Sequence, residues 1–377
     1  MESYLDNSAT TKPCKAAVEA VAEAMTTTFG NPSSLHSHGF AALKLLEASR
    51  AAVAKSLSAE PREIYFTPSG TVANNTAIFG ATMQNRRAGN RVVTTAIEHP
   101  SVSVCMDRLE EQGFEVVRIQ PDKAGHITPE QFEAAITENT ILVSFMAVNN
   151  EVGTILPFDK IKEIIRRKKA PALLHVDAVQ GYLKLPIVPK RCGIDLLSVS
   201  AHKIHGPKGV GALYINKGVR IKPYVLGGGQ EEGICSGTQG MPAIAGFAAA
   251  VGAFGSTQEN LKKVTALRDE LLALVSEFPG VQIHSPADAL PYIVNLSLAE
   301  IPSQVSVNFL SMHGVYVSAG SACSKGHRSP VLQAMALDPK QIDSAVRISL
   351  SHETTKEEIE YCAQMLKEAV VQLRKKG

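Results

Sequence analysis

The sequence lacks an excess of charge of either sign. Its 377 residues include 38 lysines and arginines against 36 aspartates and glutamates, which gives a net charge of +2. This balance excludes a strongly basic nucleic-acid-binding protein and an acidic disordered tail. Hydrophobic residues make up 45% of the chain and charged residues 20%, as is usual for globular proteins, and the length predicts two or three domains.

Long hydrophobic runs and clustered cysteines are also missing. The longest apolar stretch, residues 243–255, is shorter than the roughly 18 residues of a membrane span. Residues 1–13 contain acidic side chains and no apolar segment of a secretory signal. The six cysteines form no CxxC or Cys/His zinc pattern. We therefore expect a cytoplasmic protein with free thiols, no structural metal, no membrane contact and no nucleic-acid partner.

The first two-thirds of the chain alternates short apolar runs with helical patterns. The apolar runs predict strands at residues 92–97, 116–119, 141–148, 173–176, 194–199 and 210–215. Helical patterns occur at residues 40–57, 101–112 and 158–168. This alternation predicts an α/β fold with a mostly parallel sheet that is covered by helices on both faces.

The pattern changes near Gly255. A helical stretch at residues 261–277 is followed by strands and a charged helix, which we expect at residues 292–298, 315–318, 345–350 and 356–375. These elements predict a second, smaller α+β domain with a boundary near residues 255–260.

Polar residues at the predicted strand ends are candidates for a site, because ligands of open α/β sheets bind beyond the carboxyl ends of the strands. Ser69, Gly70 and Thr71 follow a strand-like run and open a helical stretch, which indicates a phosphate cradle or an ordinary helix cap. Asp177 ends one strand and either caps the next helix or pairs with a buried cation. Gln180 would face the same ligand.

Two basic residues and an amide also follow predicted strands. Lys203 stands next to His202 and before a glycine-rich turn, which suits a Schiff base as well as a solvated surface lysine. An imidazole in the position of His99 stacks on a flat cofactor, moves protons or only hydrogen-bonds to a turn. Asn150 belongs to a site or to a polar turn.

Two further candidates lie in the last sixty residues. Cys323 belongs to a small, polar segment at residues 318–330, which predicts an exposed, mobile loop, and neighbouring cations would favour its thiolate; an incidental loop cysteine fits as well. Arg347 would grip a carboxylate or form a surface ion pair. Together with the phosphate cradle, the strand-end anion, the lysine and the histidine, these are the parts of a pyridoxal-phosphate enzyme that acts on an amino acid.

Ten ordered segments extend this picture over almost the whole chain. They are YLDNSATT (4–11), FGNPSSLHSHG (29–39), FTPSGTVANN (66–75), EHPSV (98–102), NNEVGT (149–154), HVDAVQ (175–180), SAHKIHGPKGVGALY (200–214), GGGQEEGICSGT (227–238), SAGSACS (318–324) and VRISL (346–350). With these segments the chain resembles the cysteine desulfurases of the NifS/IscS type, fold-type I pyridoxal-phosphate enzymes of the class V aminotransferase family. The cysteine segment resembles the branch with the longer, flexible loop.

The resemblance implies a role for each candidate residue. The implied cofactor is pyridoxal 5'-phosphate, which forms a Schiff base with Lys203. Asp177 makes a salt bridge to its pyridine nitrogen, Gln180 contacts its phenolic oxygen, and His99 stacks on its ring. The residues implied to bind its phosphate are Gly70, Thr71, Ser200 and His202. Asn150 lies between cofactor and substrate, and with Arg347 it holds the carboxylate of L-cysteine. Lys203 acts as the base at Cα, and Cys323 takes the sulfur as a persulfide while alanine leaves.

The resemblance also implies an architecture and partners. A seven-stranded sheet forms a large cofactor-binding domain at residues 16–258, and a small domain at residues 259–377 carries the cysteine loop and is joined by residues 1–15. The protein forms a homodimer in which Thr238 reaches the phosphate of the other subunit. A sulfur-acceptor protein serves iron–sulfur cluster assembly or tRNA or cofactor thiolation. No resident metal is implied, although Cys323 could hold a cluster during transfer.

Several residues depart from the family pattern. Ser69 and Val72 stand where glycine and glutamate are usual, and Ser351-His352 stand where glycine-arginine is frequent. Glu232 and Cys235 stand where arginines are usual, which replaces two cations near the mouth of the site with an anion and a thiol. Cys235 is either an incidental replacement or a second thiol for sulfur relay.

Three kinds of function stay open from the sequence. The first is a cysteine desulfurase. The second is a selenocysteine lyase or another β-eliminating lyase on the same scaffold, which needs no protein thiol. The third is a weakly active homologue that serves as a scaffold, which would need neither Lys203 nor Cys323. The presence of both residues favours the desulfurase.

Overall fold

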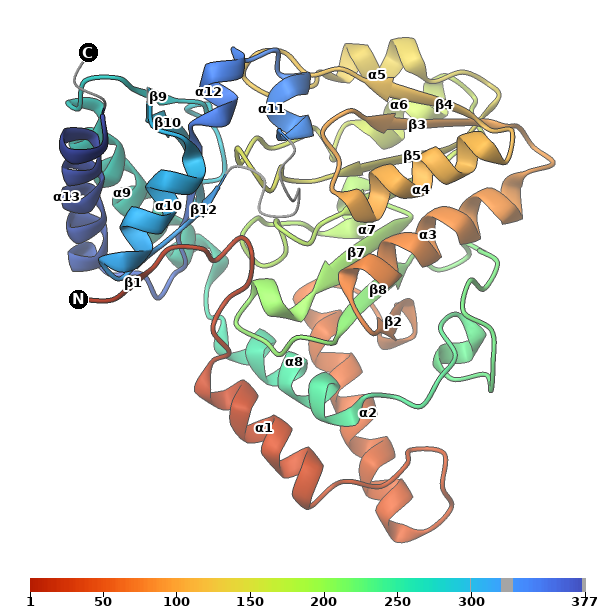
Figure 1. Ribbon diagram of the computed structural model, residues 1–377. Helices are drawn as coiled ribbons and strands as arrows, with labels where there is room; N and C mark the ends of the chain where they lie inside the picture. The colour runs from red at the N-terminus through yellow and green to blue at the C-terminus, as the bar shows by residue number, and fades with distance from the viewer. Residues whose placement is uncertain (299, 320–327, 375–377) are drawn as a thin grey trace.

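A seven-stranded sheet forms the centre of the larger part of the molecule (Figure 1). The computed structural model describes residues 1–298, 300–319 and 328–374. In spatial order the strands are β2 (Ile64–Thr67), β8 (Gly211–Ile215), β7 (Leu196–Ser200), β6 (Leu173–Asp177), β5 (Thr140–Met146), β3 (Arg91–Thr95) and β4 (Glu115–Ile119). β8 runs antiparallel to β2 and β7, and the other neighbours are parallel. The prediction of a mostly parallel sheet is confirmed.

Alternate side chains of the strands enter two separate cores, because successive residues of a strand point to opposite faces. Val92 and Leu196 pack in one core with side chains of α3 (Gly70–Asn85) and α4 (Pro100–Glu111). Val93 and Leu197 pack in the other core. That core includes side chains of α2 (Ser37–Ser56), α5 (Pro129–Ala135), α6 (Ile161–Arg167) and α8 (Met241–Ala253). Helices therefore cover both faces of the sheet, as strands that are apolar throughout require.

The other helices of this part are peripheral to the sheet. α1 (Lys15–Thr26) packs against α8, and the two lie together with α2 at the bottom of Figure 1. The remaining helical segments are α7 (Pro189–Cys192), η1 (Pro61–Glu63), η2 (Ala201–Lys203) and η3 (Glu231–Gly233).

A four-stranded antiparallel sheet forms the smaller part. Its strands are, in spatial order, β12 (Ser318–Ala319), β13 (Ala345–Ser349), β10 (Ile293–Leu298) and β9 (Val281–Ile283). Its helices are α9 (Thr257–Ser276), α10 (Ser303–Met312), α11 (Pro330–Ala334), α12 (Pro339–Asp343) and α13 (Lys356–Leu373). α13 packs against both α9 and α10.

The N-terminal residues join this smaller part before the chain enters α1. β1 (Ser3–Tyr4) pairs in parallel with β11 (Val315–Tyr316), and Asp6 forms a bridge with Ser349. The domain limits that we expect from the sequence stay a prediction. Among the described residues, no helix is both long and apolar enough to cross a membrane.

Most predicted elements differ by a few residues at their ends, and the strand predicted at residues 315–318 is divided between β11 and β12, which belong to different sheets. Two of the differences have local reasons. The strand predicted at residues 92–97 ends at Thr95, whose hydroxyl accepts a hydrogen bond from the Ile97 amide and draws the chain into a turn. The helix predicted at residues 158–168 begins at Ile161, because the residues after Pro157 first form a turn.

Candidate active site

A cavity of about 470 Å³ lies beyond the carboxyl ends of β5, β6 and β7. The last residues of these strands, Met146, Asp177 and Ser200, all line it. Ten predicted site residues are among its lining residues: Gly70, Thr71, His99, Asn150, Asp177, Gln180, Ser200, His202, Lys203 and Arg347. Residues that are far apart in the sequence meet here because parallel strands end at the same edge of the sheet.

The N-terminus of α3 forms one wall of the cavity. Ser69 is the N-cap, and its hydroxyl accepts a hydrogen bond from an amide of the first turn at 3.2 Å. The amides of Gly70 and Thr71 stand outside the intrahelical hydrogen-bond pattern, as the first amides of a helix do. A Cβ atom on Gly70 would lie 2.8 Å from Val179 Cγ2 and 3.3 Å from Ser200 Cβ, so glycine keeps this wall open. The Ser200 hydroxyl is buried, with no hydrogen-bond partner among the described residues.

Asp177 is fixed in the cavity wall by two hydrogen bonds. Its Oδ2 accepts from Asn74 Nδ2 at 2.7 Å, and its Oδ1 accepts from the Val179 amide at 2.9 Å. Asn74 belongs to α3 and also donates to Ser101 Oγ at 2.9 Å. A carboxylate that is 6% exposed and held in this way suits a cationic partner in the cavity.

Lys203 follows β7 and contacts the N-terminal segment. Its Nζ donates to the carbonyl oxygens of Ser8 at 2.5 Å and Ala9 at 2.7 Å. Gln180 Nε2 donates to the same Ser8 carbonyl at 3.0 Å, whereas Gln180 Oε1 is buried without a partner among the residues described. Burial and the nearby Lys203 charge lower the pKa of His202 to about 4, so its imidazole is neutral at pH 7.

His99 and Glu98 form a second wall. His99 is the N-cap of α4, and its Nδ1 accepts from the Ser101 amide at 3.1 Å. Burial lowers the pKa of His99, which favours a neutral ring. Glu98 Oε1 accepts from the Thr95 hydroxyl at 2.5 Å and from the Met146 amide at 3.1 Å. Burial raises the pKa of Glu98 to about 8.

Arg347 is buried in the cavity wall and is 4% exposed. Its Nη1 donates to the Asn150 carbonyl at 2.9 Å, and its Nη2 donates to Asp6 Oδ1 at 3.1 Å and Ser318 Oγ at 3.2 Å. Its Nε is buried and has no partner among the described residues. The alternative of a surface ion pair is therefore wrong: Arg347 pairs with Asp6 inside the molecule, at the cavity.

Both ends of the cysteine segment are bonded to the cavity wall. Ser318 contacts Arg347 as described, and the Ser329 hydroxyl donates to Glu151 Oε2 at 2.5 Å. Ser329 is also the N-cap of α11. Burial raises the pKa of Glu151 to about 7. Cys323 itself lies outside the described residues.

Two other singled-out residues lie away from the cavity. Thr238 is exposed and does not line it. Cys235 is buried, and burial raises the pKa of its thiol, which disfavours the reactive thiolate. Next to Cys235, Glu231 receives two hydrogen bonds from Arg50, at 2.6 and 2.8 Å.

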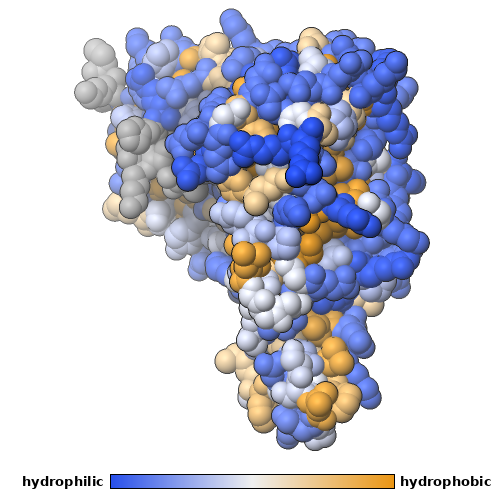
Figure 2. All heavy atoms as spheres, turned by 90° about the vertical axis from the view of Figure 1, so that its right-hand side faces the viewer, coloured by the Kyte–Doolittle hydropathy of each residue, from blue (hydrophilic) through white to orange (hydrophobic). Residues whose placement is uncertain are grey.

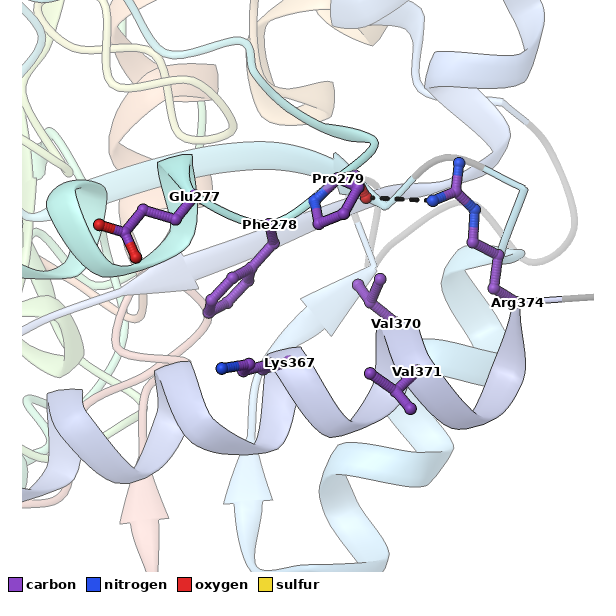
Figure 3. Close-up of a pocket in the computed structure, with 7 residues that line it drawn as sticks. All are labelled: Glu277, Phe278, Pro279, Lys367, Val370, Val371 and Arg374. Carbon is purple, nitrogen blue, oxygen red and sulfur yellow. Dashed lines mark hydrogen bonds between the residues drawn. The ribbon is translucent and has the colours of Figure 1, made fainter.

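A second, shallower groove lies between the end of α9 and the last turns of α13 (Figure 3). Phe278, Val370 and Val371 supply its apolar lining, and Arg374 Nη1 donates to the Pro279 carbonyl at 3.4 Å. None of the predicted site residues lines this groove.

Sequence patterns do not single out four residues that shape the cavity. These are Asp6, Asn74, Glu98 and Glu151. Each lies within one of the ten quoted segments, and that membership is the only signal the sequence offers for them.

The lining residues fit pyridoxal phosphate. The amides at the start of α3 and the unpartnered Ser200 hydroxyl are donors suited to a phosphate. Asp177 suits a protonated ring nitrogen, and the flat His99 ring suits stacking. Lys203 provides the amine that this cofactor requires.

Comparison with known proteins places the chain among enzymes of this kind. The family model for class V aminotransferases matches residues 3–362. A cysteine desulfurase IscS from Methanosarcina thermophila is 39% identical over 375 residues, covering 98% of this chain and 92% of that protein. A solved structure named NifS-like protein aligns with a TM-score of 0.93 at 37% identity, covering 98% of this chain and all of that one. A structure of SspA in complex with cysteine aligns with a TM-score of 0.83 at 32% identity, covering 94% of this chain and all of that one.

Proposed function

The chain belongs to the class V aminotransferase family, and we propose that it is a pyridoxal-phosphate-dependent cysteine desulfurase that converts L-cysteine to L-alanine. The observation that carries the proposal is one cavity that joins Lys203, Asp177 and Arg347. An amine, a fixed carboxylate and a guanidinium are what a cofactor aldehyde, its ring nitrogen and an amino-acid carboxylate need.

The cofactor supplies, when bound, a ring that withdraws electrons from the Cα atom of an amino acid. Asp177 holds a proton on the ring nitrogen through its carboxylate, which Asn74 keeps in place. Lys203 would hold the cofactor through its amine, and the same amine would move the proton at Cα as a base. The carbonyls of Ser8 and Ala9 give its ammonium a defined position beside the cavity.

Arg347 binds the substrate carboxylate. Its guanidinium is already oriented by Asp6, Ser318 and the Asn150 carbonyl, so little side-chain entropy is lost on binding. Its buried, unpartnered Nε is a donor that remains for the carboxylate. The position of Arg347 selects substrates with a free α-carboxylate.

Cys323 receives the sulfur in this proposal. Its thiolate attacks the substrate sulfur, the substrate C–S bond breaks, and Cys323 keeps the sulfur as a persulfide while alanine is formed with a new C–H bond. Ser318 and Ser329, near the two ends of the cysteine segment, both bond to residues that line the cavity. This placement supports a segment that starts and ends at the site. The persulfide then passes to an acceptor protein in iron–sulfur cluster assembly or thiolation.

A homodimer is part of the proposal. Four large apolar side chains, Met25, Phe29, Leu35 and Phe40, are each more than half exposed. Figure 2 shows hydrophobic atoms on the lower projection of the molecule, where α1 and the start of α2 lie. Exposed apolar surface of this kind marks contact sites. Thr238, exposed and outside its own cavity, would reach the cofactor phosphate of the other subunit.

A reducing compartment, the cytoplasm, suits thiol chemistry of this kind. The five cysteines among the described residues are all free. They are Cys14, Cys105, Cys192, Cys235 and Cys362.

Product analysis tests the function. Purified protein with pyridoxal phosphate is given L-cysteine and a reductant, and alanine and sulfide are measured. We expect equal amounts of both from the wild type and from the control variant Cys192→Ala, and neither from Cys323→Ala. Pyruvate and ammonia that survive the Cys323 substitution would instead identify a β-eliminating lyase. Cofactor binding without any product would favour the scaffold function.

A further inference from the structure

Three metal-ligating side chains from the two parts of the molecule meet near the cofactor lysine. His205 lies two residues beyond Lys203, and His352 and Glu353 follow β13. Their ligand atoms all lie within 4.8 Å of one another, and His205 Nδ1 is 3.4 Å from Glu353 Oε2. We propose that His205, His352 and Glu353 bind a zinc ion, which departs from our sequence-based expectation of no structural metal.

The imidazole rings are held in place for this role. His205 Nδ1 lies 2.9 Å from the Lys12 carbonyl, and a proton donated there leaves Nε2 with a lone pair for a metal. The ring of His352 packs edge-on between His205, at 4.8 Å, and Phe254, at 4.6 Å. His352 Nδ1 is buried without a hydrogen-bond partner among the described residues. Such an atom costs free energy, and a metal ion supplies the missing partner.

Three charged side chains lie at the cluster: Lys184, Lys263 and Glu353. Two lysines face the histidines. Burial lowers the pKa of Lys184 to about 7, and Lys263 Nζ donates to the His352 carbonyl at 2.6 Å. The Glu353 carboxylate offsets one of these charges, and Lys263 is exposed, so water and salt screen its charge.

The ligand set suits zinc better than calcium or magnesium, because two imidazoles and one carboxylate form a site with nitrogen ligands. Zinc bonds of about 2.0–2.2 Å require ligand atoms roughly 3.3–3.5 Å apart. The 3.4 Å contact of Glu353 Oε2 is with His205 Nδ1, which faces the Lys12 carbonyl, so the carboxylate has to turn towards Nε2 to share a metal with this ring. The Glu353 side chain is 53% exposed, so it can rotate to bring the wider pairs closer and can leave a fourth position to water.

Such an ion joins the turn after Lys203 to the turn after β13. It therefore clamps the larger part of the molecule to the smaller one beside the active site. Because the ion binds the folded protein and not the unfolded chain, it raises the melting temperature in proportion to the logarithm of its concentration above Kd.

The test measures zinc bound by the holoenzyme carrying Cys323→Ser, so that this thiol does not compete for the metal. We expect one zinc per chain after dialysis and a higher melting temperature with zinc than without it. His352→Asn on the same background should bind zinc at least about tenfold more weakly and lose the melting shift. His38→Asn, which alters an exposed histidine beside His36, is the matched control and should change neither value.

Two results would overturn the proposal: no zinc bound by the Cys323→Ser protein beyond the exposed-histidine background, or equal zinc affinity with and without His352. Glu353→Gln serves as a second variant because an exposed side chain is substituted without loss of folding. It should also weaken zinc binding, and unchanged binding in Glu353→Gln would equally contradict the three-ligand site. Neither readout depends on desulfurase activity, so the zinc site and the proposed function fail or stand separately.

Discussion

The buried carboxyl group of Glu98 gives the molecule a pH-dependent stability. Its Oε1 accepts from Thr95 and Met146, and its Oε2 is buried with no partner among the described residues. Burial raises the pKa of Glu98 from 4.5 to about 8. Between these values the folded protein holds a proton that the unfolded chain releases. The contribution of Glu98 to the free energy of unfolding is therefore largest below pH 4.5 and falls by about 1.4 kcal/mol per pH unit towards pH 8, on the order of 5 kcal/mol in all.

Glu98→Gln removes this titration while it keeps the shape and the accepting oxygen. Between pH 6 and pH 8 the wild type should lose about 2 kcal/mol of unfolding free energy relative to the variant, since Glu98 is half ionised at pH 8. Urea unfolding of both holoenzymes at the two pH values measures this difference. Glu138→Gln, at an exposed position, is the control and should behave as the wild type does. The reasoning is refuted if wild type and Glu98→Gln show the same pH dependence.

Three further predictions concern binding and stability. Arg347→Lys should raise KM for L-cysteine roughly tenfold to hundredfold, because an ammonium group does not reproduce the planar set of donors of the guanidinium. Steady-state kinetics measure this, and an unchanged KM would show that Arg347 does not bind the carboxylate. Arg50→Ala should lower the free energy of unfolding by about 3–5 kcal/mol, because the Glu231 carboxylate stays buried without its cation; a urea titration that matches the wild type would contradict this. Gly70→Ala should weaken cofactor binding at least about tenfold, because the new Cβ meets Val179 Cγ2 at 2.8 Å. Absorbance titration of the apoprotein with pyridoxal phosphate measures the affinity, and wild-type affinity would contradict a phosphate site at the N-terminus of α3.

The sequence predicts the sheet and the cavity wall well, because both follow from local patterns. Apolar runs predict the parallel strands, and a polar residue directly after such a run has to lie at the carboxyl edge of the sheet. Asp177 and Ser200 are of this kind. The helix α8 is harder to predict, since its alanine-rich run at residues 243–255 shows no amphipathic period and packs between α1 and α2.

Residues that hold another side chain or a strand end in place by hydrogen bonds leave no such pattern in the sequence. Asn74 holds Asp177 from a helix that precedes it by about a hundred positions, and nothing in the local sequence reports this contact. The same is true of Glu98, whose partners include the end of a strand 48 positions away. A pattern reports the period and the neighbours of a segment, whereas these hydrogen bonds depend on which strand ends lie side by side.

The hydrogen bonds of Arg347 also join segments that lie far apart in the sequence. Its three partners, Asp6, Asn150 and Ser318, come from the N-terminal segment, the loop after β5 and the strand that leads into the cysteine segment. A guanidinium in a strand of the smaller part thus holds together three segments that the sequence separates by up to 312 positions.

A carboxylate that binds Arg347 would alter the balance of these contacts, including that of Ser318. If Arg347 binds the substrate carboxylate, as we propose, substrate binding is coupled through this side chain to the position of β12, the strand before Cys323. Ser318→Ala should weaken this coupling, so that KM for L-cysteine changes less than the rate of persulfide formation on Cys323, measured in a single turnover. Equal changes in both would show that Ser318 only supports the fold.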